Sequence, residues 1–380
     1  MATMSKRSLR IGLDVRSIGQ RVCGVSRVSS RIVQALSDID KENTYIIYVD
    51  QAVSEWRLGA NFEVKRTGCS RINLFYEAKF YSILSHDTLD ILHTFHAYLP
   101  HLLPHRCKSI VTMHDIFSVT DPLFFIKYHP FHRFIQTYFS FLTQRTIKRA
   151  DYIITVSCFS KNEICRVFSS AAHKIDVVYN APGLTSGSFA ACNEPDVNGN
   201  YLLYVGNCRS YKNIDVLLAG FQKYVSNNPA GKMRLVMAGN DYGPRLIVMI
   251  KSFGLQENIV TYTNPTDQEM QSLYKNAIAF VLPSKYEGFG IPVLEAMSFN
   301  VPVIISNAAA LVEVAGDAAL VFDQNKPEDL AGAIEKLVSD EHLQDELRRK
   351  GRDRVKMFTW EKSARQLCVL YESLGLAVTK

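Results

Sequence analysis

Two glutamates in the segment SKYEGFGIPVLEAMSF (residues 284–299) have the chemistry and spacing to bind a ligand rich in hydroxyl groups. Glu287 follows the apolar run AIAFVLPS, and Glu295 comes eight residues later, after two glycines and a proline. A carboxylate accepts hydrogen bonds from hydroxyl groups, and the N–H groups at a helix start bind phosphate. We therefore predict a loop carrying Glu287 and a helix with Glu295 in its first turn. The alternative is that Glu287 is solvated and Glu295 only favours the helix dipole.

A second loop with binding chemistry lies in YLLYVGNCRSYKNIDVLL (residues 201–218), between an apolar strand and a helix. Gly206 lets the backbone approach a ligand closely. Arg209 and Lys212 stand near the start of the helix, where fixed cations and backbone N–H groups reinforce each other around a diphosphate. The alternative is a solvated basic loop, but this strand, loop and helix repeat the arrangement around Glu287.

The first half of the chain offers two weaker candidates. Gly24 stands in the loop GVSR before a helical segment. This loop faces the phosphates or the sugar of a ligand. The alternative is a routine turn between a strand and a helix. The loop lacks the spacing of a dinucleotide fingerprint. His114 and Asp115 follow the strand SIVTM. As a functional residue, the histidine hydrogen-bonds a hydroxyl group or stabilises charge near a reacting carbon, and Asp115 orients it. The alternative is a structural histidine.

Two further groups resemble metal ligands, and we expect neither to bind a metal. The first comprises the four histidines His93, His96, His101 and His105. It contains no carboxylate or cysteine, and two prolines interrupt its helical spacing. The second, Asp38-Ile39-Asp40, has the DxD pattern of some sugar transferases but lies at a helix end. We interpret it as a solvated helix cap.

These loops require strands that end where the loops begin. Short apolar runs alternate with helical segments along both halves of the chain, which is typical of α/β folds with parallel, doubly wound sheets. A stretch rich in Gly, Ala, Ser, Asn and Pro separates the halves. We predict one domain over 1–182, a linker over 183–199 and a second domain over 200–359. We further expect the helix within 360–380 to pack back on the first domain, and a ligand-binding cleft to lie between the domains.

Composition limits the class of protein. The 380 residues are 47% hydrophobic and 21% charged, as in globular proteins. We expect a cytoplasmic chain, because it has neither an apolar run long enough to span a bilayer nor a signal peptide. The eight cysteines form no CxxC pair, which predicts that they are reduced thiols.

Residues 1–190 hold 23 Lys and Arg against 15 Asp and Glu, a net charge of +8. Their partner should be acidic: a phosphate, an anionic lipid or a nucleic acid.

The segment LFFIKYHPFHRFIQTYFSFLTQRTIKRA (residues 123–150) contains five Lys or Arg, many aromatic residues and no acid. Such a segment lies at a membrane surface or binds an anionic, lipid-linked acceptor. Alternatively, aromatic residues at helical spacing pack in a core. We interpret the middle of the segment as core and leave its basic ends open.

The motifs together resemble the family 4 retaining glycosyltransferases of the GT-B fold, in which two Rossmann-like domains face a central cleft. The resemblance covers nearly the whole chain and depends most on EGFGIPVLE, the family's E-x7-E element, and on GNCRSYKNI. The segments GVSR, HDIF, VSCFSKNEI and VVYNAPG follow the family's order. YNAPG replaces the common Asn-Gly-Val-Asp, which leaves the acceptor contacts and hinge open. The LDVRSIGQ start is most similar to bacterial polysaccharide mannosyl-type enzymes.

The resemblance implies that the chain transfers a sugar from a nucleotide diphosphate to a hydroxyl of a glycan or lipid-linked acceptor, with retained configuration. It implies neither a metal nor another cofactor, and no nucleic acid partner. Mannose from GDP-mannose is our first choice of donor, and peripheral contact with the inner face of the membrane is a further expectation. A nucleotide-sugar epimerase and a catalytically silent nucleotide-sugar-binding protein are the alternatives.

The same resemblance assigns roles to individual residues. Arg209 and Lys212 would neutralise the diphosphate, Glu287 would bind the transferred sugar, and Glu295 would bind the ribose. The remaining donor contacts would come from Gly206 and from the turn Gly288, Phe289, Gly290 and Ile291. Gly24 and His114 would close the site from the first domain. The expected catalytic residues are His114, Arg209, Lys212 and Glu287.

Overall fold

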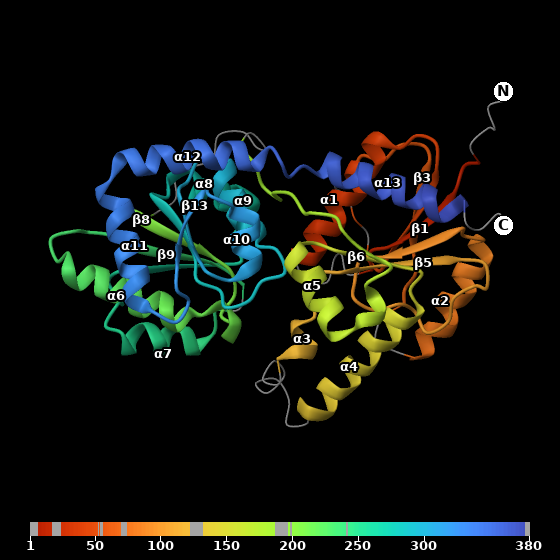
Figure 1. Cartoon of the computed structure of the whole chain (residues 1–380), viewed down its shortest axis with the longest axis horizontal. Helices are drawn as coiled ribbons and strands as arrows, with labels where there is room; N and C mark the ends of the chain where they lie inside the picture. The colour runs from red at the N-terminus through yellow and green to blue at the C-terminus, as the bar shows by residue number, and fades with distance from the viewer. Residues whose placement is uncertain are drawn as a thin grey trace. The chain divides into compact units, whose positions relative to one another are not determined.

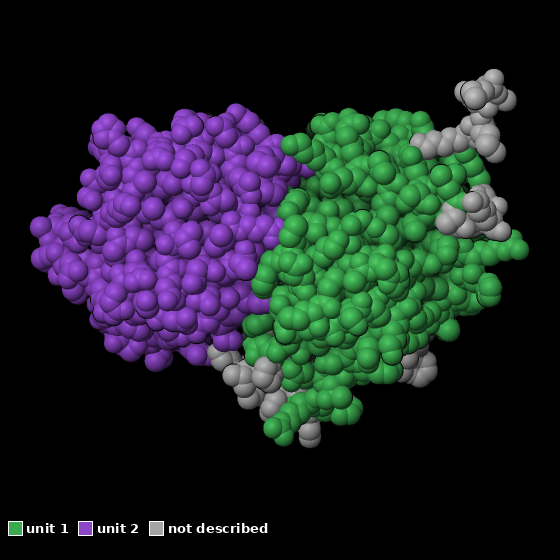
Figure 2. All heavy atoms as spheres, viewed as in Figure 1, with its two compact units in different colours: residues 1–180, 360–380 green, residues 181–359 purple. Residues whose placement is uncertain are grey.

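The computed structural model describes residues 7–16, 24–51, 53, 56–69, 74–121, 132–186, 197, 200–240 and 242–376. The chain forms two compact units. Unit 1 comprises residues 1–180 and 360–380, and unit 2 comprises residues 181–359; Figure 2 shows them in green and purple. Most of the predicted linker, 187–196 and 198–199, lies outside the described residues.

Unit 1 contains a parallel sheet, as predicted. Its strand order in the described residues is β3-β2-β1-β4-β5-β6-β7. The strands are β1 (Arg10–Asp14), β2 (Thr44–Val49), β3 (Phe62–Arg66), β4 (Ile91–Thr94), β5 (Lys108–Met113), β6 (Tyr152–Thr155) and β7 (Ile175–Val177). Strands β1, β2, β4, β5 and β6 are buried at every residue after the first, as expected for a parallel sheet covered on both faces.

Helices cover the sheet of unit 1 (Figure 1). They are α1 (Gly24–Ile39), α2 (Leu74–Asp87), α3 (Phe117–Thr120), α4 (His132–Arg149), α5 (Cys158–Val167), the short 3₁₀ helix η1 (Ser169–Ala171) and α13 (Trp360–Leu376). The C-terminal helix α13 packs against α1, at the opposite end of the chain's sequence. The described part of the chain contains no helix long and apolar enough to cross a membrane.

A buried histidine ties α13 to the sheet of unit 1. His93 on β4 is fully buried, and its Nδ1 lies 2.7 Å from the hydroxyl of Tyr371 on α13. Its Nε2 lies 2.7 Å from Oγ1 of Thr112 on β5. One ring nitrogen therefore binds the C-terminal helix and the other binds a neighbouring strand. A further contact of α13 comes from Ser363 Oγ, which donates to the Tyr179 carbonyl at 2.6 Å.

The free energy of unfolding of unit 1 should fall as the pH drops from 7 toward 4. Burial lowers the pKa of His93 to about 3, so near pH 6.5 the unfolded chain takes up a proton that the folded chain does not. The unfolded state then binds more protons, and the loss for this residue is about 1.4 kcal/mol per pH unit below about 6.5. Trp56 and Trp360, the chain's only tryptophans, both lie in unit 1, so denaturant titrations followed by tryptophan fluorescence measure it. His93→Gln should flatten the pH dependence, and equal slopes would contradict this account.

The aromatic segment of unit 1 differs in part from its prediction. Residues 122–131 lie outside the described residues. In α4 one face is core, with Thr143, Thr146 and Ile147 buried, whereas Phe134 and Phe141 are exposed. The interpretation of the middle of the segment as core is therefore wrong for this outward face, because the aromatic residues follow the helical period on the side away from the sheet.

Unit 2 contains the second predicted parallel sheet, with strand order β10-β9-β8-β11-β12-β13 in the described residues. Its strands are β8 (Tyr201–Val205), β9 (Arg234–Gly239), β10 (Ile259–Thr263), β11 (Ala279–Leu282), β12 (Val303–Ser306) and β13 (Ala319–Phe322). Its helices are η2 (Ser210–Lys212), α6 (Ile214–Asn227), α7 (Pro244–Ser252), α8 (Asp267–Asn276), α9 (Ile291–Ser298), α10 (Ala309–Ala315), α11 (Pro327–Ser339) and α12 (Glu341–Val355). Helices α6 and α11 pack together, and α12 packs on α9 (Figure 1).

Candidate active site

The two predicted binding loops of unit 2 follow neighbouring strands. Strands β8 and β11 are parallel and adjacent in the sheet, so their carboxyl ends lie at the same edge. The loop after β8 contains Arg209 and η2, and the loop after β11 contains Glu287 just before α9. Ligands of such sheets bind at this edge.

Asn213 and Tyr211 hold the two loops together. Asn213 is buried in the left-handed conformation, with φ 58°, at the start of α6. Its side-chain amide donates to the carbonyls of Pro283 at 3.0 Å and of Gln324 at 2.7 Å. The backbone N–H of Lys285 donates to the Tyr211 carbonyl at 2.7 Å. The loops are therefore one connected structure.

Lys212 and Glu287 form the centre of the site. The ammonium of Lys212 lies 2.6 Å from Oε1 of Glu287, and both side chains are largely buried. Ser284 is fully buried, and its hydroxyl donates to the same Oε1 at 2.7 Å. In these contacts Oε1 receives both donors, which orients the carboxylate. The structure thus joins two residues that lie 75 positions apart in the sequence.

The pairing of Lys212 with Glu287 keeps Lys212 charged. Burial alone would lower the pKa of Lys212, but the neighbouring Glu287 carboxylate raises it above its usual value, against a smaller opposite effect of Arg209. Lys212 is therefore a cation at neutral pH. Arg209 is exposed, at the start of η2. Two cations on one short loop provide the charge that binding a diphosphate requires.

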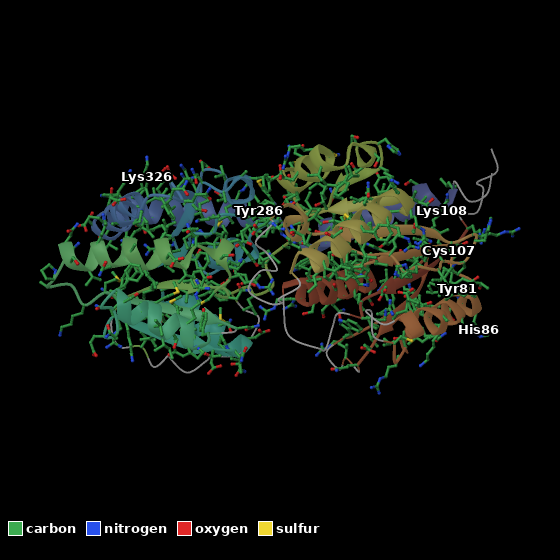
Figure 3. All side chains as sticks on the ribbon, turned by 90° about the horizontal axis from the view of Figure 1, so that it is seen from below. Tyr81, His86, Cys107, Lys108, Tyr286 and Lys326 are labelled. Carbon is green, nitrogen blue, oxygen red and sulfur yellow. The ribbon has the colours of Figure 1, made fainter. Side chains whose placement is uncertain are left out.

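Glycines are required at two turns of the site. At Gly206 a Cβ atom would lie 2.6 Å from the hydroxyl of Tyr204. Gly290 precedes α9 with φ 98°, and a Cβ there would lie 2.5 Å from the side chain of Leu311. The turn also carries Gly288 and Ile291, as the sequence indicated. Figure 3 labels Tyr286, which precedes Glu287 in the sequence.

Phe289 in the same turn has a structural side chain. Its ring is buried in an edge-on contact with Phe358, with ring centres 5.8 Å apart. Any contribution of Phe289 to donor binding therefore comes from its backbone. The side chain anchors the turn to the core of unit 2.

Glu295 lies apart from this centre. It is in the second turn of α9, one turn later than predicted, because the helix begins at Ile291. Its carboxylate is buried and accepts hydrogen bonds from the backbone N–H of Leu184 at 3.2 Å and from the hydroxyl of Tyr274 at 2.9 Å. Ser298 Oγ lies 3.2 Å from the Leu184 carbonyl. Glu295 therefore fixes the segment by which the chain enters unit 2, and its role toward a ribose stays a prediction.

Replacing Glu295 by alanine should lower the free energy of unfolding of unit 2 by about 2–4 kcal/mol, because two buried donors lose their acceptor. Tyr274→Phe removes one of these donors and should cost less. Scanning calorimetry measures both variants. If Glu295 also binds a ribose, Glu295→Gln should raise KM for the donor well beyond what Tyr274→Phe does. A stability of Glu295→Ala equal to wild type would contradict the structural role.

In unit 1, His114 follows β5 at the carboxyl edge of the sheet. Ser160 Oγ donates to its carbonyl at 3.2 Å. Burial lowers the pKa of His114 to about 4, although a hydrogen bond to the Phe95 backbone raises it slightly. The imidazole is thus neutral at pH 7, which favours hydrogen bonding to a hydroxyl over stabilising charge. Its Nε2 is buried without a hydrogen-bond partner in the described part of the protein, so the hydrogen-bonding capacity of this nitrogen is unused there.

Two other candidates of unit 1, Asp40 and His96, have structural partners. Gly24 is the first residue of α1, and residues 17–23 before it lie outside the described residues. Asp40 is buried after α1 and accepts from the Tyr45 hydroxyl at 2.6 Å, so the expectation of a solvated cap is wrong for this residue. His96 lies 3.1 Å from Asp14. In the described residues no group of three or more His, Cys, Asp or Glu could hold a metal ion.

Buried charges stabilise the carboxyl edge of this sheet. Asp14, at the end of β1, is fully buried and pairs with Arg16 at 2.8 Å. Burial would raise the pKa of Asp14, but Arg16 and His96 together hold it well below its usual value. The Arg16 guanidinium also lies 3.6 Å from the ring centre of Phe80. This cluster was not predicted from the sequence, although Asp14, Arg16 and His96 stand in the LDVR and TFH segments at strand ends.

Family models match both parts of the chain. Residues 53–181 match the model described as Glycosyltransferase Family 4, and residues 190–354 match the one described as Glycosyl transferases group 1. O-antigen chain mannosyltransferase B of Escherichia coli is 32% identical over 295 residues, which is 75% of this chain and 74% of that protein. O-antigen chain mannosyltransferase RfbU of Salmonella typhimurium is 29% identical, over 66% of this chain and 65% of that protein.

A solved structure shares the fold. Sucrose-phosphate synthase from Thermosynechococcus elongatus superposes with a TM-score of 0.73 at 18% identity, over 98% of this chain and 100% of that one. The predicted GT-B fold, with its two parallel-sheet α/β domains, is therefore confirmed. Together with the family models and the identity to the Escherichia coli protein, this shows that the chain belongs to the GT-B glycosyltransferases with a Glycosyltransferase Family 4 segment followed by a Glycosyl transferases group 1 segment.

Proposed function

We propose that the protein transfers a sugar from a nucleotide diphosphate to a hydroxyl of a glycan or lipid-linked acceptor in polysaccharide biosynthesis, with retained configuration. The observation that supports this most is the Lys212–Glu287–Ser284 arrangement beside Arg209, on adjoining loops of unit 2. It combines cations for a diphosphate with a carboxylate for sugar hydroxyls. Mannose from GDP-mannose is the first choice of donor, since two of the relatives are named as mannosyltransferases.

In the proposed reaction the bond between the sugar's anomeric carbon and the diphosphate oxygen breaks, and negative charge grows on the leaving diphosphate. Lys212 and Arg209 stabilise that charge more in the transition state than in the ground state, which accelerates the step. These cations provide the charge that a metal ion supplies in other sugar transferases, so we propose a reaction without a metal or cofactor. The acceptor hydroxyl attacks on the face that the diphosphate leaves, and its proton passes to a diphosphate oxygen.

Glu287 and His114 have different tasks in this proposal. Oε1 of Glu287 receives Lys212 and Ser284, and its second oxygen can accept from a hydroxyl of the transferred sugar. Neutral His114 accepts a hydrogen bond at Nε2 from a hydroxyl of the donor or acceptor. Gly24, at the start of α1, and the N–H groups of the Gly288–Ile291 turn are further proposed donor contacts, and Glu295 is proposed for the ribose.

A lipid-linked acceptor would place the reaction at a membrane surface. We therefore include in the proposal a peripheral contact with the inner face of the membrane through the basic unit 1, and a cytoplasmic location for the protein. We propose no nucleic acid partner.

The decisive experiment incubates the protein with a panel of nucleotide sugars, including GDP-mannose, with and without lipid-linked and oligosaccharide acceptors. Release of nucleotide diphosphate that depends on the acceptor supports transfer, and NMR of the product's anomeric centre decides retention. Conversion of the donor without an acceptor would instead indicate an epimerase, and donor binding without turnover a silent binding protein.

A further inference from the structure

The outward face of α4 in unit 1 is aromatic. Phe134, Tyr138 and Phe141 are 76%, 45% and 59% exposed. They stand four and three positions apart, so they line one face of the helix. In Figures 1 and 2 the first turns of α4 extend beyond the rest of unit 1. A contiguous exposed patch of large apolar side chains of this kind marks an interaction site.

The fold does not need this aromatic face. The inward face of α4 packs on the sheet with Ile147 and with two threonines, Thr143 and Thr146, all of them buried. Thr146 Oγ1 accepts from the backbone N–H of Leu99 at 3.2 Å. The helix therefore buries two hydroxyl groups and exposes two of its three phenyl rings, whereas Phe139 is half-buried beside Tyr98. Exposed rings opposite buried hydroxyl groups reverse the usual arrangement for a helix on a sheet. We name Phe134, Tyr138 and Phe141 the aromatic stripe.

Positive charge surrounds the aromatic stripe. Helix α4 contains four Lys or Arg and no Asp or Glu. Arg133 is exposed at its beginning, and Lys148 and Arg149 are exposed at its end. A second copy of this helix would repel it, whereas an anionic surface with an apolar interior complements both its charge and its rings.

We propose that the outward face of α4 docks on an anionic phospholipid bilayer. The aromatic stripe enters the interface between headgroups and acyl chains, and Arg133 and Lys148 contact the lipid phosphates. This names the surface for the membrane contact included in the proposed function. It is tested with no sugar donor present, so that sugar transfer and docking can each fail alone.

The test is co-sedimentation of the full chain with vesicles of phosphatidylcholine alone or mixed with phosphatidylglycerol. The wild type should bind the mixed vesicles. The variant Phe134→Ser, Tyr138→Ser, Phe141→Ser should bind about 100-fold more weakly, because three aromatic side chains no longer leave water. Arg133→Gln with Lys148→Gln should bind about tenfold more weakly at low salt, and added salt should remove this difference.

The matched control is Tyr81→Ser, which removes another exposed aromatic residue of unit 1, on α2 (Figure 3). It should bind vesicles as the wild type does. Docking through α4 is refuted if the wild type stays in the supernatant with mixed vesicles, if the triple variant sediments like the wild type, or if Tyr81→Ser loses as much binding. It is also refuted if the aromatic stripe instead mediates dimerisation without lipid, measured by light scattering.

A second variant keeps the test decisive if circular dichroism shows the triple variant misfolded. Phe141→Trp preserves an aromatic side chain and adds a fluorophore to the stripe. After subtraction of the wild-type spectrum, its emission should shift to the blue with mixed vesicles and not with phosphatidylcholine alone. Unchanged emission with mixed vesicles would overturn the proposal.

Discussion

Lys212→Ala is expected to lower kcat by about 10²- to 10³-fold, because the variant loses a fixed cation at the position where charge grows on the leaving diphosphate. It should also weaken nucleoside diphosphate binding. The structure sharpens this expectation, since Lys212 is largely buried and held by Glu287 at 2.6 Å. A cation in such a site acts more strongly than an exposed one. Initial rates with the donor that the panel identifies, and calorimetric titration with the nucleoside diphosphate, measure the two effects.

Lys285→Ala is the matched control for this change. Lys285 stands on the neighbouring loop and is exposed, so its removal changes the net charge equally without altering the buried pair. Its kcat should stay within a fewfold of wild type. Lys212→Arg keeps the charge but not the compact ammonium, and we expect only partial activity. Equal activity of Lys212→Ala and Lys285→Ala would contradict the assigned role.

Most of the fold could be predicted because the strands of both parallel sheets are continuous apolar runs. In the described residues of unit 2, each of the six strands corresponds to an apolar run visible in the sequence. Strand β3 (Phe62–Arg66) was missed. It lies at the edge of its sheet, and its sequence FEVKR is largely charged because much of it faces solvent. Hydrophobic pattern identifies a strand by its apolar residues, and FEVKR has only two of them.

The sequence was enough to predict which loops carry the candidate site, but not which side chains contact one another there. The resemblance assigned Arg209 and Glu287 to one donor, and parallel strands bring their carboxyl ends to one edge of a sheet. That Ser284 and Lys212 both bind Oε1 of Glu287 depends on side-chain geometry. The available signals were Ser284, three positions before Glu287, and Asn213, whose type tolerates the left-handed conformation found there.

Glu295 and α4 show two further limits of sequence reasoning. Spacing placed Glu295 behind the turn but could not show that Leu184 and Tyr274 would bind its carboxylate. In α4 the aromatic residues have helical spacing whether they face the core or the solvent. Only the packing of the neighbouring elements decides between these two orientations. In this protein the helix face with the buried threonines packs on the sheet.

Glu287→Ala is expected to reduce kcat by about 10³-fold with the nucleoside diphosphate still bound. The reason is that the carboxylate oxygen proposed for the sugar hydroxyls disappears, and Lys212 loses the partner that raises its pKa and fixes its position. Glu287→Gln keeps the shape and one acceptor oxygen but removes the charge, so its loss should be smaller. Rates and diphosphate affinity measured for both variants separate sugar binding from leaving-group binding.

Variants of Ser284 test whether the orientation of the Glu287 carboxylate matters for the reaction. Ser284→Ala leaves Glu287 and Lys212 chemically unchanged and removes only the 2.7 Å hydrogen bond that turns the carboxylate. If orientation matters, Ser284→Ala should lower kcat by about tenfold and Ser284→Thr should restore much of it, with diphosphate affinity unaltered. Because these residues act as a unit, Ser284→Ala in the Glu287→Ala background should have almost no further effect. Full additivity of the two changes would show that Ser284 acts on stability or on another contact, and would remove the basis for an oriented carboxylate.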